Sequence, residues 1–260
     1  IHDNELADCA DDGIEADYAM GNVRVYGNRL TATFMGISSQ PSLGGPTYLV
    51  RNAMYGTILE PFKLHNGSTG NLIVHNTVVK NGDGLAVYSG APISRSWFRN
   101  NLVLGGTGGG TFNGFDTGTG RLVEMVDCDG TCDLDYDGLG SVGTGLASGH
   151  VGNIKFTSFA ELTSLTTEKH ATQLGIEALG ATSFPTSPFP EPAPQDLRLS
   201  AGSAALDKGV VLAGLNDGYA GAAPDLGAYE GTDALPAYGP RDGGAGTGGA
   251  AGAGGGGGAG

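Results

Sequence analysis

The sequence predicts an all-β protein, a right-handed parallel β-helix with a C-terminal capping region that contains a short helix. The first observation is a set of asparagines that recur at one constant interval, at Asn4, Asn28, Asn52, Asn76 and Asn100. The second is that apolar residues keep fixed offsets from them, and the third is that these residues alternate in short runs rich in β-branched types. A fixed period of this size is typical of repeat architectures, and the alternation indicates strands.

The repeated positions also predict what fills the interior. The apolar residues three before and two after the asparagines are expected in the core: Val25, Leu49, Ile73 and Trp97, and Leu6, Leu30, Met54, Val78 and Leu102. Stacked coils bring equivalent asparagines together, so their amides are expected to bond from coil to coil as a ladder. Burial of an amide requires that its donors and acceptors find partners, which a ladder provides.

The composition divides the chain into three parts. Residues 1–106 carry the repeat and are expected to form four to five coils, with the first coil incomplete and further coils before it. Residues 107–235 are expected to form C-terminal coils and the capping region. Residues 236–260 are a tether rich in Gly and Ala, and we expect disorder over 243–260 because such residues have nothing to pack.

Three local patterns describe the second part. Ser158 and Glu161 form a capping box, which predicts a helix to about Lys169 that covers the end of the stack. The proline-rich residues 184–194 are expected to be an extended connector. Residues 195–230 return to apolar and polar alternation and are expected to pack back on the solenoid.

Two further patterns each allow two interpretations. Residues 133–138 resemble the first half of a calcium loop, but Thr144 stands where the closing Glu is needed, so a further strand with a solvated turn is favoured. Cys128 and Cys132 are close enough in sequence to form a disulfide, which export favours, and Cys9 is left over. The alternative is three reduced thiols.

The repeat resembles the right-handed parallel β-helix proteins of the pectate-lyase-like superfamily, particularly secreted bacterial members. A second resemblance lies in the tail, in Asp196–Leu199, Gly202–Gly209 and Ala223–Glu230. It implies a polysaccharide laid along an exposed sheet, and a secreted or surface-attached protein. The superfamily includes lyases, hydrolases, epimerases and proteins without activity, so the fold alone does not select a reaction.

The net charge of the chain limits the classes of binding partner. The net charge is −14, which argues against nucleic acid. Residues 1–106 have seven basic and nine acidic residues, about −2, whereas the remainder has six and eighteen, about −12. The solenoid could therefore accept an anionic polymer. No apolar run is long enough for a membrane span, and we expect a monomer.

One face collects the candidate residues. Alternation places Ile14, Ala16, Phe62 and Leu64 inward, so their neighbours point outward. The outward set is Glu15, Asp17, Ser39, Pro41, Lys63 and His65. We expect catalysis from Lys63, His65, Glu15 and Asp17, and substrate contacts from Glu60, Asp11 and Asp12.

Several functions fit this face. In a lyase, Asp11, Asp12, Glu15 and Asp17 would bind Ca²⁺, which acidifies a uronate, and Lys63 would remove the α-proton. In a glycoside hydrolase, two carboxylates would flank the bond. The third interpretation is a non-catalytic, glycan-binding or structural surface.

A second column could hold an acidic polymer without reacting with it. It consists of Gly27, Arg51, His75 and Arg99, each one residue before a ladder asparagine. Its alternative is a row of solvated turn residues.

Overall fold

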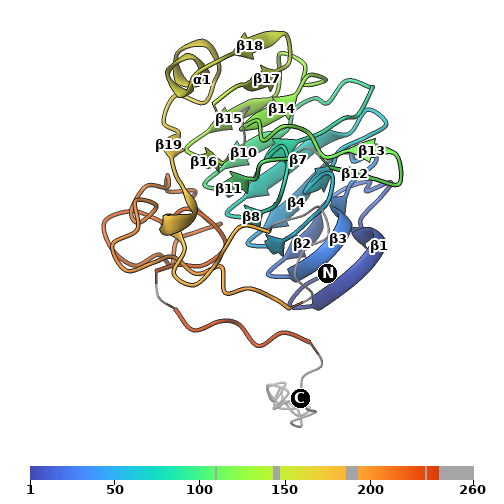
Figure 1. Ribbon diagram of the computed structural model, residues 1–260. Helices are drawn as coiled ribbons and strands as arrows, with labels where there is room; N and C mark the ends of the chain where they lie inside the picture. Colours follow the sequence, from blue (N-terminus) through green and yellow to red (C-terminus); the bar gives the residue numbers. More distant parts are fainter. Residues whose placement is uncertain (109, 143–146, 186–192, 232, 240–260) are drawn as a thin grey trace, which may run out of the picture.

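The chain winds into a parallel β-solenoid of about six turns (Figure 1). The computed structural model describes residues 1–108, 110–142, 147–185, 193–231 and 233–239. Thr144, most of the proline-rich segment and the segment 243–260 lie outside these ranges, so the expectations made for them stay predictions. The predicted all-β fold with one short helix is confirmed.

Three sheets form the faces of the solenoid. The first contains β1 (Glu5–Glu15), β3 (Arg29–Ser38), β5 (Ala53–Tyr55), β8 (Thr77–Val79), β11 (Leu102–Gly105), β16 (Gly138–Ser141) and β19 (Thr172–Gln173), with β6 (Phe62–Lys63) paired to the end of β3. The second contains β2 (Val23–Tyr26), β4 (Leu43–Val50), β7 (Thr69–Val74), β10 (Trp97–Arg99) and β15 (Asp133–Asp135). The third contains β9 (Leu85–Ala86), β14 (Val123–Met125), β17 (Gly149–Val151) and the antiparallel β18 (Ile154–Phe156). A separate hairpin joins β12 (Thr111–Phe112) to β13 (Phe115–Asp116).

Apolar columns run through the interior along the stack. One column pairs Leu30, Met54, Val78, Val103 and Leu139 through successive strands of the first sheet. Another pairs Val25, Leu49, Ile73, Phe98 and Leu134 through the second sheet. Trp97 was expected in this column and is instead half-buried on the outside, because the fourth coil is longer by one residue and Phe98 takes the inward place.

The asparagine ladder is confirmed over its first four members. Asn28, Asn52 and Asn76 are fully buried, and each accepts from the previous asparagine's backbone N and side-chain Nδ2 at 2.9–3.1 Å. The extra residue in the fourth coil shifts the next step. Asn101, and not Asn100, accepts from Asn76, so the assignment of Asn100 to the ladder was wrong.

A sharp turn precedes every ladder residue. The residue before each one has positive φ, between 53° and 63°; these residues are Asp3, Gly27, Arg51, His75, Asn100 and Tyr136. Only one of the six is a glycine, although this conformation costs other residues about 1–2 kcal/mol. The ladder bonds, repeated at the same place on every coil, offset that strain.

Asp137 ends the ladder. Its Oδ1 accepts from the backbone N and Nδ2 of Asn101 at 2.8 and 2.9 Å, and its own N donates to Glu168 at 3.0 Å. Residues 133–135 form β15, which confirms the strand interpretation of this acidic run. The following turn, expected in solvent, is instead buried at Asp137, because that residue continues the ladder.

The predicted helix forms at one end of the stack (Figure 1). In α1 (Phe159–Leu165) the Ser158 side chain accepts from Glu161 N, and Leu162 is buried in the solenoid core. The helix ends four residues before Lys169, because Thr166 is extended and its hydroxyl donates to Leu162 O. A 3-10 turn, η1 (Ile176–Ala178), follows β19.

The tail packs back on the solenoid as expected, but mostly without strands. Leu197, Leu199, Ala205 and Leu226 lie in one apolar cluster with Tyr55, Val79 and Leu104 of the first sheet. Backbone N–H groups of the tail reach the coils directly: Ala228 N donates to Thr77 Oγ1, and Gly227 N donates to Asn100 O. The tail thus covers the outer surface of the first sheet.

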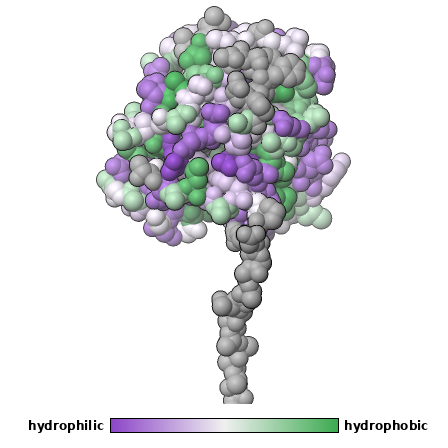
Figure 2. All heavy atoms as spheres, turned by 60° about the horizontal axis from the view of Figure 1, so that its bottom comes forward, coloured by the Kyte–Doolittle hydropathy of each residue, from purple (hydrophilic) through white to green (hydrophobic). Residues whose placement is uncertain are grey.

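The disulfide prediction is also confirmed, since Cys128 and Cys132 are bonded with Cα atoms 5.8 Å apart. Cys9 is free and half-buried. The face seen in Figure 2 mixes small hydrophobic and hydrophilic areas. Within the described ranges, no helix combines the length and apolarity that crossing a membrane requires.

Candidate functional site

The structure places the outward residues of the predicted face in a corrected register. Glu15 lies beside Ser38, and Ser38 lies beside Lys63. Ser39 was expected outward, but it is buried and bonds to Asn71. A bulge between Cys9 and Asp12 shortens the spacing between paired residues of β1 and β3 by one, so Ser38 and not Ser39 lies beside Glu15. Pro41 is buried as well. Ile14, Ala16, Phe62 and Leu64 are buried as predicted.

Lys63 is engaged by Asp12. The Nζ–Oδ2 distance is 2.9 Å, and the two side chains are 14% and 1% exposed. Partial burial disfavours the charged amine, but the hydrogen bond and charge of Asp12, helped by Asp11 and Asp17, outweigh it and raise the pKa of Lys63. A proton-abstracting lysine needs a lowered pKa, so this pair does not support Lys63 as a base.

The four carboxylates proposed for calcium have separate surroundings. Asp11 and Glu15 are exposed, Asp12 pairs with Lys63, and Asp17 accepts from Ser38 Oγ at 2.6 Å and Gln40 N at 2.9 Å. Within the described part of the chain, no three His, Cys, Asp or Glu side chains converge as a metal site. Their arrangement does not fit a calcium ligand set, because Asp12 and Asp17 are occupied by other partners and the four side chains do not converge.

His65 and Glu60 do come together. His65 Nε2 lies 3.0 Å from both carboxylate oxygens of Glu60, which is fully buried. The backbone N of Tyr88 donates to Glu60 Oε1 at 3.1 Å. The two residues flank β6 and form a carboxylate–imidazole pair, an arrangement that can hold and transfer a proton.

Asp83 extends this pair on the next coil. Its Oδ1 accepts from the backbone N of Thr119 and of Arg121, both at 2.8 Å, and its Oδ2 accepts from Tyr88 Oη at 2.9 Å. Burial and the neighbouring carboxylates raise the pKa of Tyr88, so its hydroxyl stays protonated and donates. Tyr88 therefore links Glu60 and Asp83.

A buried lysine lies behind Asp83. Lys80 Nζ donates to the backbone oxygens of Asn81 and Asp83 at 2.9 and 2.6 Å. Burial lowers the pKa of Lys80 to about 8, against the opposing charges of Asp83 and Glu60. The ammonium is thus retained at neutral pH and places a positive charge beneath the two carboxylates.

The third sheet continues the polar row. Arg121 Nη1 lies 3.5 Å from Asp83 Oδ2 and 3.4 Å from Glu124 Oε1. Glu124 pairs in register with His150 on the next strand, and His150 Nδ1 lies 2.9 Å from Glu124 Oε2. Acids, imidazoles and a guanidinium therefore follow one another across four coils.

A cavity of about 350 Å³ opens over part of this row. It is lined by Met35, Leu59, Glu60, His65, Asp83, Tyr88, Phe115, Asp116, Gly118 and Arg121. Phe115 is 51% exposed and comes from the β12–β13 hairpin, which rests on Phe34. We call this the Glu60 cavity. It joins two buried carboxylates, an imidazole and a guanidinium under an aromatic wall.

Sequence reasoning found only Glu60 and His65 of this site. It did not single out Asp83, and it had no register for Arg121, Glu124 and His150. The β12–β13 hairpin is inserted between β9 and β14, so the paired residues Leu85 and Val123 are much further apart in the sequence than one regular coil. The constant period of the asparagines therefore carries no information beyond the fourth coil.

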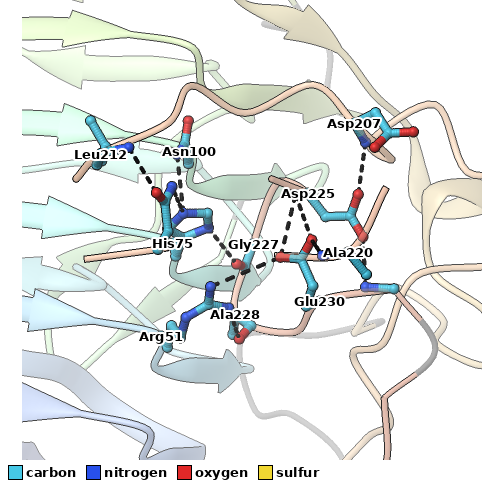
Figure 3. A network of polar contacts seen from close by, with 12 residues as sticks. Arg51, His75, Asn100, Asp207, Leu212, Ala220, Asp225, Gly227, Ala228 and Glu230 are labelled. Atoms are coloured by element: carbon cyan, nitrogen blue, oxygen red, sulfur yellow. Dashed lines mark hydrogen bonds and ion pairs between the residues drawn. The ribbon is translucent and has the colours of Figure 1, made fainter. Parts of the chain in front are cut away.

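The second column predicted from the sequence, Gly27, Arg51, His75 and Arg99, is called the basic stripe here. The tail covers Arg51 and His75 of this stripe (Figure 3). His75 is fully buried; its Nδ1 lies 3.2 Å from Gly227 O, and its Nε2 lies 3.0 and 2.8 Å from the amides of Asn100 and Asn216. Burial and the charge of Arg51 lower the pKa of His75 to about 3. His75 is therefore neutral and holds the tail in place.

The two arginines of the stripe have different surroundings. Arg51 donates to Ala228 O at 3.2 Å and lies 3.9 Å from Glu230 (Figure 3). Arg99 belongs to strand β10 and pairs with Asp133 at 2.8 Å. These contacts exclude a continuous basic track along Arg51, His75 and Arg99.

The chain matches no protein-family profile, and a comparison with curated proteins finds no similar sequence. The case for function therefore depends on the geometry of the site.

Proposed function

We propose that the Glu60 cavity binds a polysaccharide and hydrolyses one of its glycosidic bonds. The observation that carries the proposal is the pair of buried carboxylates, Glu60 and Asp83, that line one cavity with an aromatic wall. Glycosidases use two carboxyl groups on either side of the bond, one as proton donor and the other as base or nucleophile. The fold supports a chain-like substrate, because the cavity lies along stacked strands.

The roles follow from the partners of each carboxylate. The Glu60–His65 pair can supply a proton to the leaving oxygen, since the imidazole lies within hydrogen-bond distance of both carboxylate oxygens. Asp83 accepts hydrogen bonds from two backbone N–H groups and from Tyr88, which hold its carboxyl group in place at the cavity. Phe115 gives an apolar surface for a sugar ring.

The charge of the cavity favours a neutral sugar. Glu60, Asp83 and Asp116 line it, against Arg121 and His65. An acidic substrate was the first expectation from sequence, but a uronate would meet carboxylates here. Export of the protein, its attachment to a cell surface and its monomeric state stay proposals.

A second candidate is β-elimination of a uronate, and it is favoured by one observation. Arg121 lies in the same cavity as His65, so it could hold the substrate carboxylate while the imidazole removes the α-proton. This version needs no lysine base. Non-catalytic glycan binding by the same cavity is the third.

One experiment separates them. The full chain is incubated with neutral polysaccharides and with uronate polymers. New reducing ends, the ultraviolet absorbance of an unsaturated product and binding of the protein to each polymer are measured. Reducing ends without absorbance support hydrolysis, absorbance supports elimination, and binding without either product supports a binding protein. In the hydrolase, Glu60→Gln and Asp83→Asn should each lower kcat/KM by about 10²-fold or more. Glu177→Gln, an exposed carboxylate elsewhere, should leave it unchanged.

A further inference from the structure

A second groove lies between the second sheet and the tail. Its floor is the outer surface of β2, β4 and β7, where Arg24 lies beside Tyr48 and Tyr48 lies beside Leu72. Tyr26 and Val50 form the next column. The intervening Val25 and Leu49 are buried, so alternation turns this set outward.

The tail supplies the other wall. Ala213, Gly214, Leu215, Ala228, Tyr229 and Pro236 face the strands across a cavity of about 760 Å³. The tail is held there by Arg51, which donates to Ala228 O. The cavity is within the size range of small-ligand sites, and it shares no lining residue with the Glu60 cavity.

Aromatic rings and guanidinium groups dominate the chemistry of this groove. Tyr26 is 41% exposed, with one face of its ring stacked on His2 at 4.7 Å, and Tyr48 lies under the guanidinium of Arg24, which is 5.6 Å from the ring centre. Arg24 is exposed, and its Nε donates to the uncharged Asn22. Among the described residues, no carboxylate lies within ion-pair distance of Arg24. Its charge is therefore available to a ligand.

This combination points to an acidic sugar. The C–H face of a sugar ring packs on an aromatic ring, whose face is electron-rich. Arg24, which lies two residues from Tyr26 on the same face of β2, can bind the carboxylate of a sugar packed on Tyr26 through two parallel hydrogen bonds. Asp3 is the one acidic residue that lines the groove in the described part of the chain, and it limits how many anionic groups the groove can accept.

We propose that the groove formed by Arg24, Tyr26 and Tyr48 binds uronate units of an acidic polysaccharide. It is a binding site without a catalytic pair, separate from the Glu60 cavity and independent of the reaction proposed there. It also gives the near-neutral solenoid half of the chain an anion-binding surface, at a place different from the basic stripe.

The test is calorimetric titration of the full chain with tetramers of galacturonate, mannuronate and guluronate, each beside its methyl ester. We expect at least one free acid to bind, more weakly as NaCl increases, and its ester to bind at least about tenfold more weakly. Arg24→Ala and Tyr48→Ala should each weaken the binding of that acid about tenfold or more. The control variants Lys155→Ala and Tyr18→Ala remove an exposed cation and an exposed ring outside the groove and should bind like the parent.

Several outcomes would overturn the proposal. They are no binding of any uronate tetramer, equal binding of acid and ester, or unchanged affinity in both groove variants while circular dichroism shows them folded. Binding of a sulfated tetramer alone would also contradict it, because the site would then recognise another anion. Loss of binding in Glu60→Gln with retention in Arg24→Ala would place the acidic sugar in the other cavity.

Discussion

Asp137→Asn should stabilise the protein at neutral pH. In the ladder, each asparagine accepts through Oδ1 and donates through Nδ2. Asp137 accepts from Asn101 in the usual way, but it has no amide to donate toward Glu168. Asp137 Oδ2 and Glu168 Oε2 are buried and find no hydrogen-bond donor in the described part of the chain. Two carboxyl groups therefore meet where the ladder needs one N–H group, and a proton has to take its place.

The pKa shifts give the sign and size of the effect. Burial raises the pKa of Asp137 to about 6, and burial with the Asp137 charge raises the pKa of Glu168 well above its usual range. Native protein then binds more protons than the unfolded chain above pH ~4, so stability falls as pH rises through this window. A shift from 3.8 to about 6 corresponds to at most about 3 kcal/mol.

Urea unfolding followed by circular dichroism at pH 4.5, 5.5, 6.5 and 7.5 measures this. We expect the parent protein to lose stability across the series. Asp137→Asn should gain roughly 1–3 kcal/mol at pH 7.5, because its amide supplies the missing donor, and its pH slope should flatten. Asp11→Asn removes an exposed carboxylate and serves as the control. A less stable Asp137→Asn at pH 7.5, or an unchanged slope, would refute this explanation of the pair.

Three further predictions concern other parts of the molecule. Asn52→Leu removes four side-chain hydrogen bonds in the middle of the ladder and should lower the free energy of unfolding in urea by roughly 2–4 kcal/mol. Asn4→Leu removes two at the end of the ladder and should cost clearly less. Equal losses in the two variants would contradict the ladder. Lys63→Ala should lower the melting temperature, corresponding to roughly 1–3 kcal/mol, because it leaves the buried Asp12 carboxylate without its partner. Adding Asp12→Asn should restore most of the loss. An unchanged melting temperature in Lys63→Ala would show that stability does not depend on the pair. Mass spectrometry of protein purified without reductant should find Cys128 and Cys132 linked and only Cys9 open to alkylation, and alkylation of all three would disprove the bond.

The sequence pattern does not reveal the contribution of Lys63 to stability. Alternation predicted that Lys63 points outward, and an exposed outward residue usually contributes little to stability. Alternation cannot show that the bulge near Cys9 turns Asp12 toward Lys63, since bulges change the register locally. The sequence period therefore predicted the sheets, and it missed the ion pair that one bulge creates.

The fold was predictable for as long as coil length stayed constant. Asn28, Asn52 and Asn76 follow the period, and their burial was predicted correctly. The sequence could not show whether Asn100 or Asn101 continues the ladder, because both are asparagine and only the pairing of β10 with β7 decides which one faces Asn76. His75 was also ambiguous: its contacts to Asn216 and Gly227 come from the distant tail, and no local pattern encodes them.

The tail determines how the molecule would carry a mechanical load. It bonds Thr77, Asn100 and Arg51 and finally reaches the first coil, where Gly239 N donates to Asp3 O. A force applied at residue 239 would therefore act first on contacts with the earliest coils. These contacts lie side by side across several coils, so the load would break the contacts between the tail and the coils before it could unwind a coil. We call this row of tail contacts the strap. The opposite end, closed by α1, would stay unstrained until the strap released.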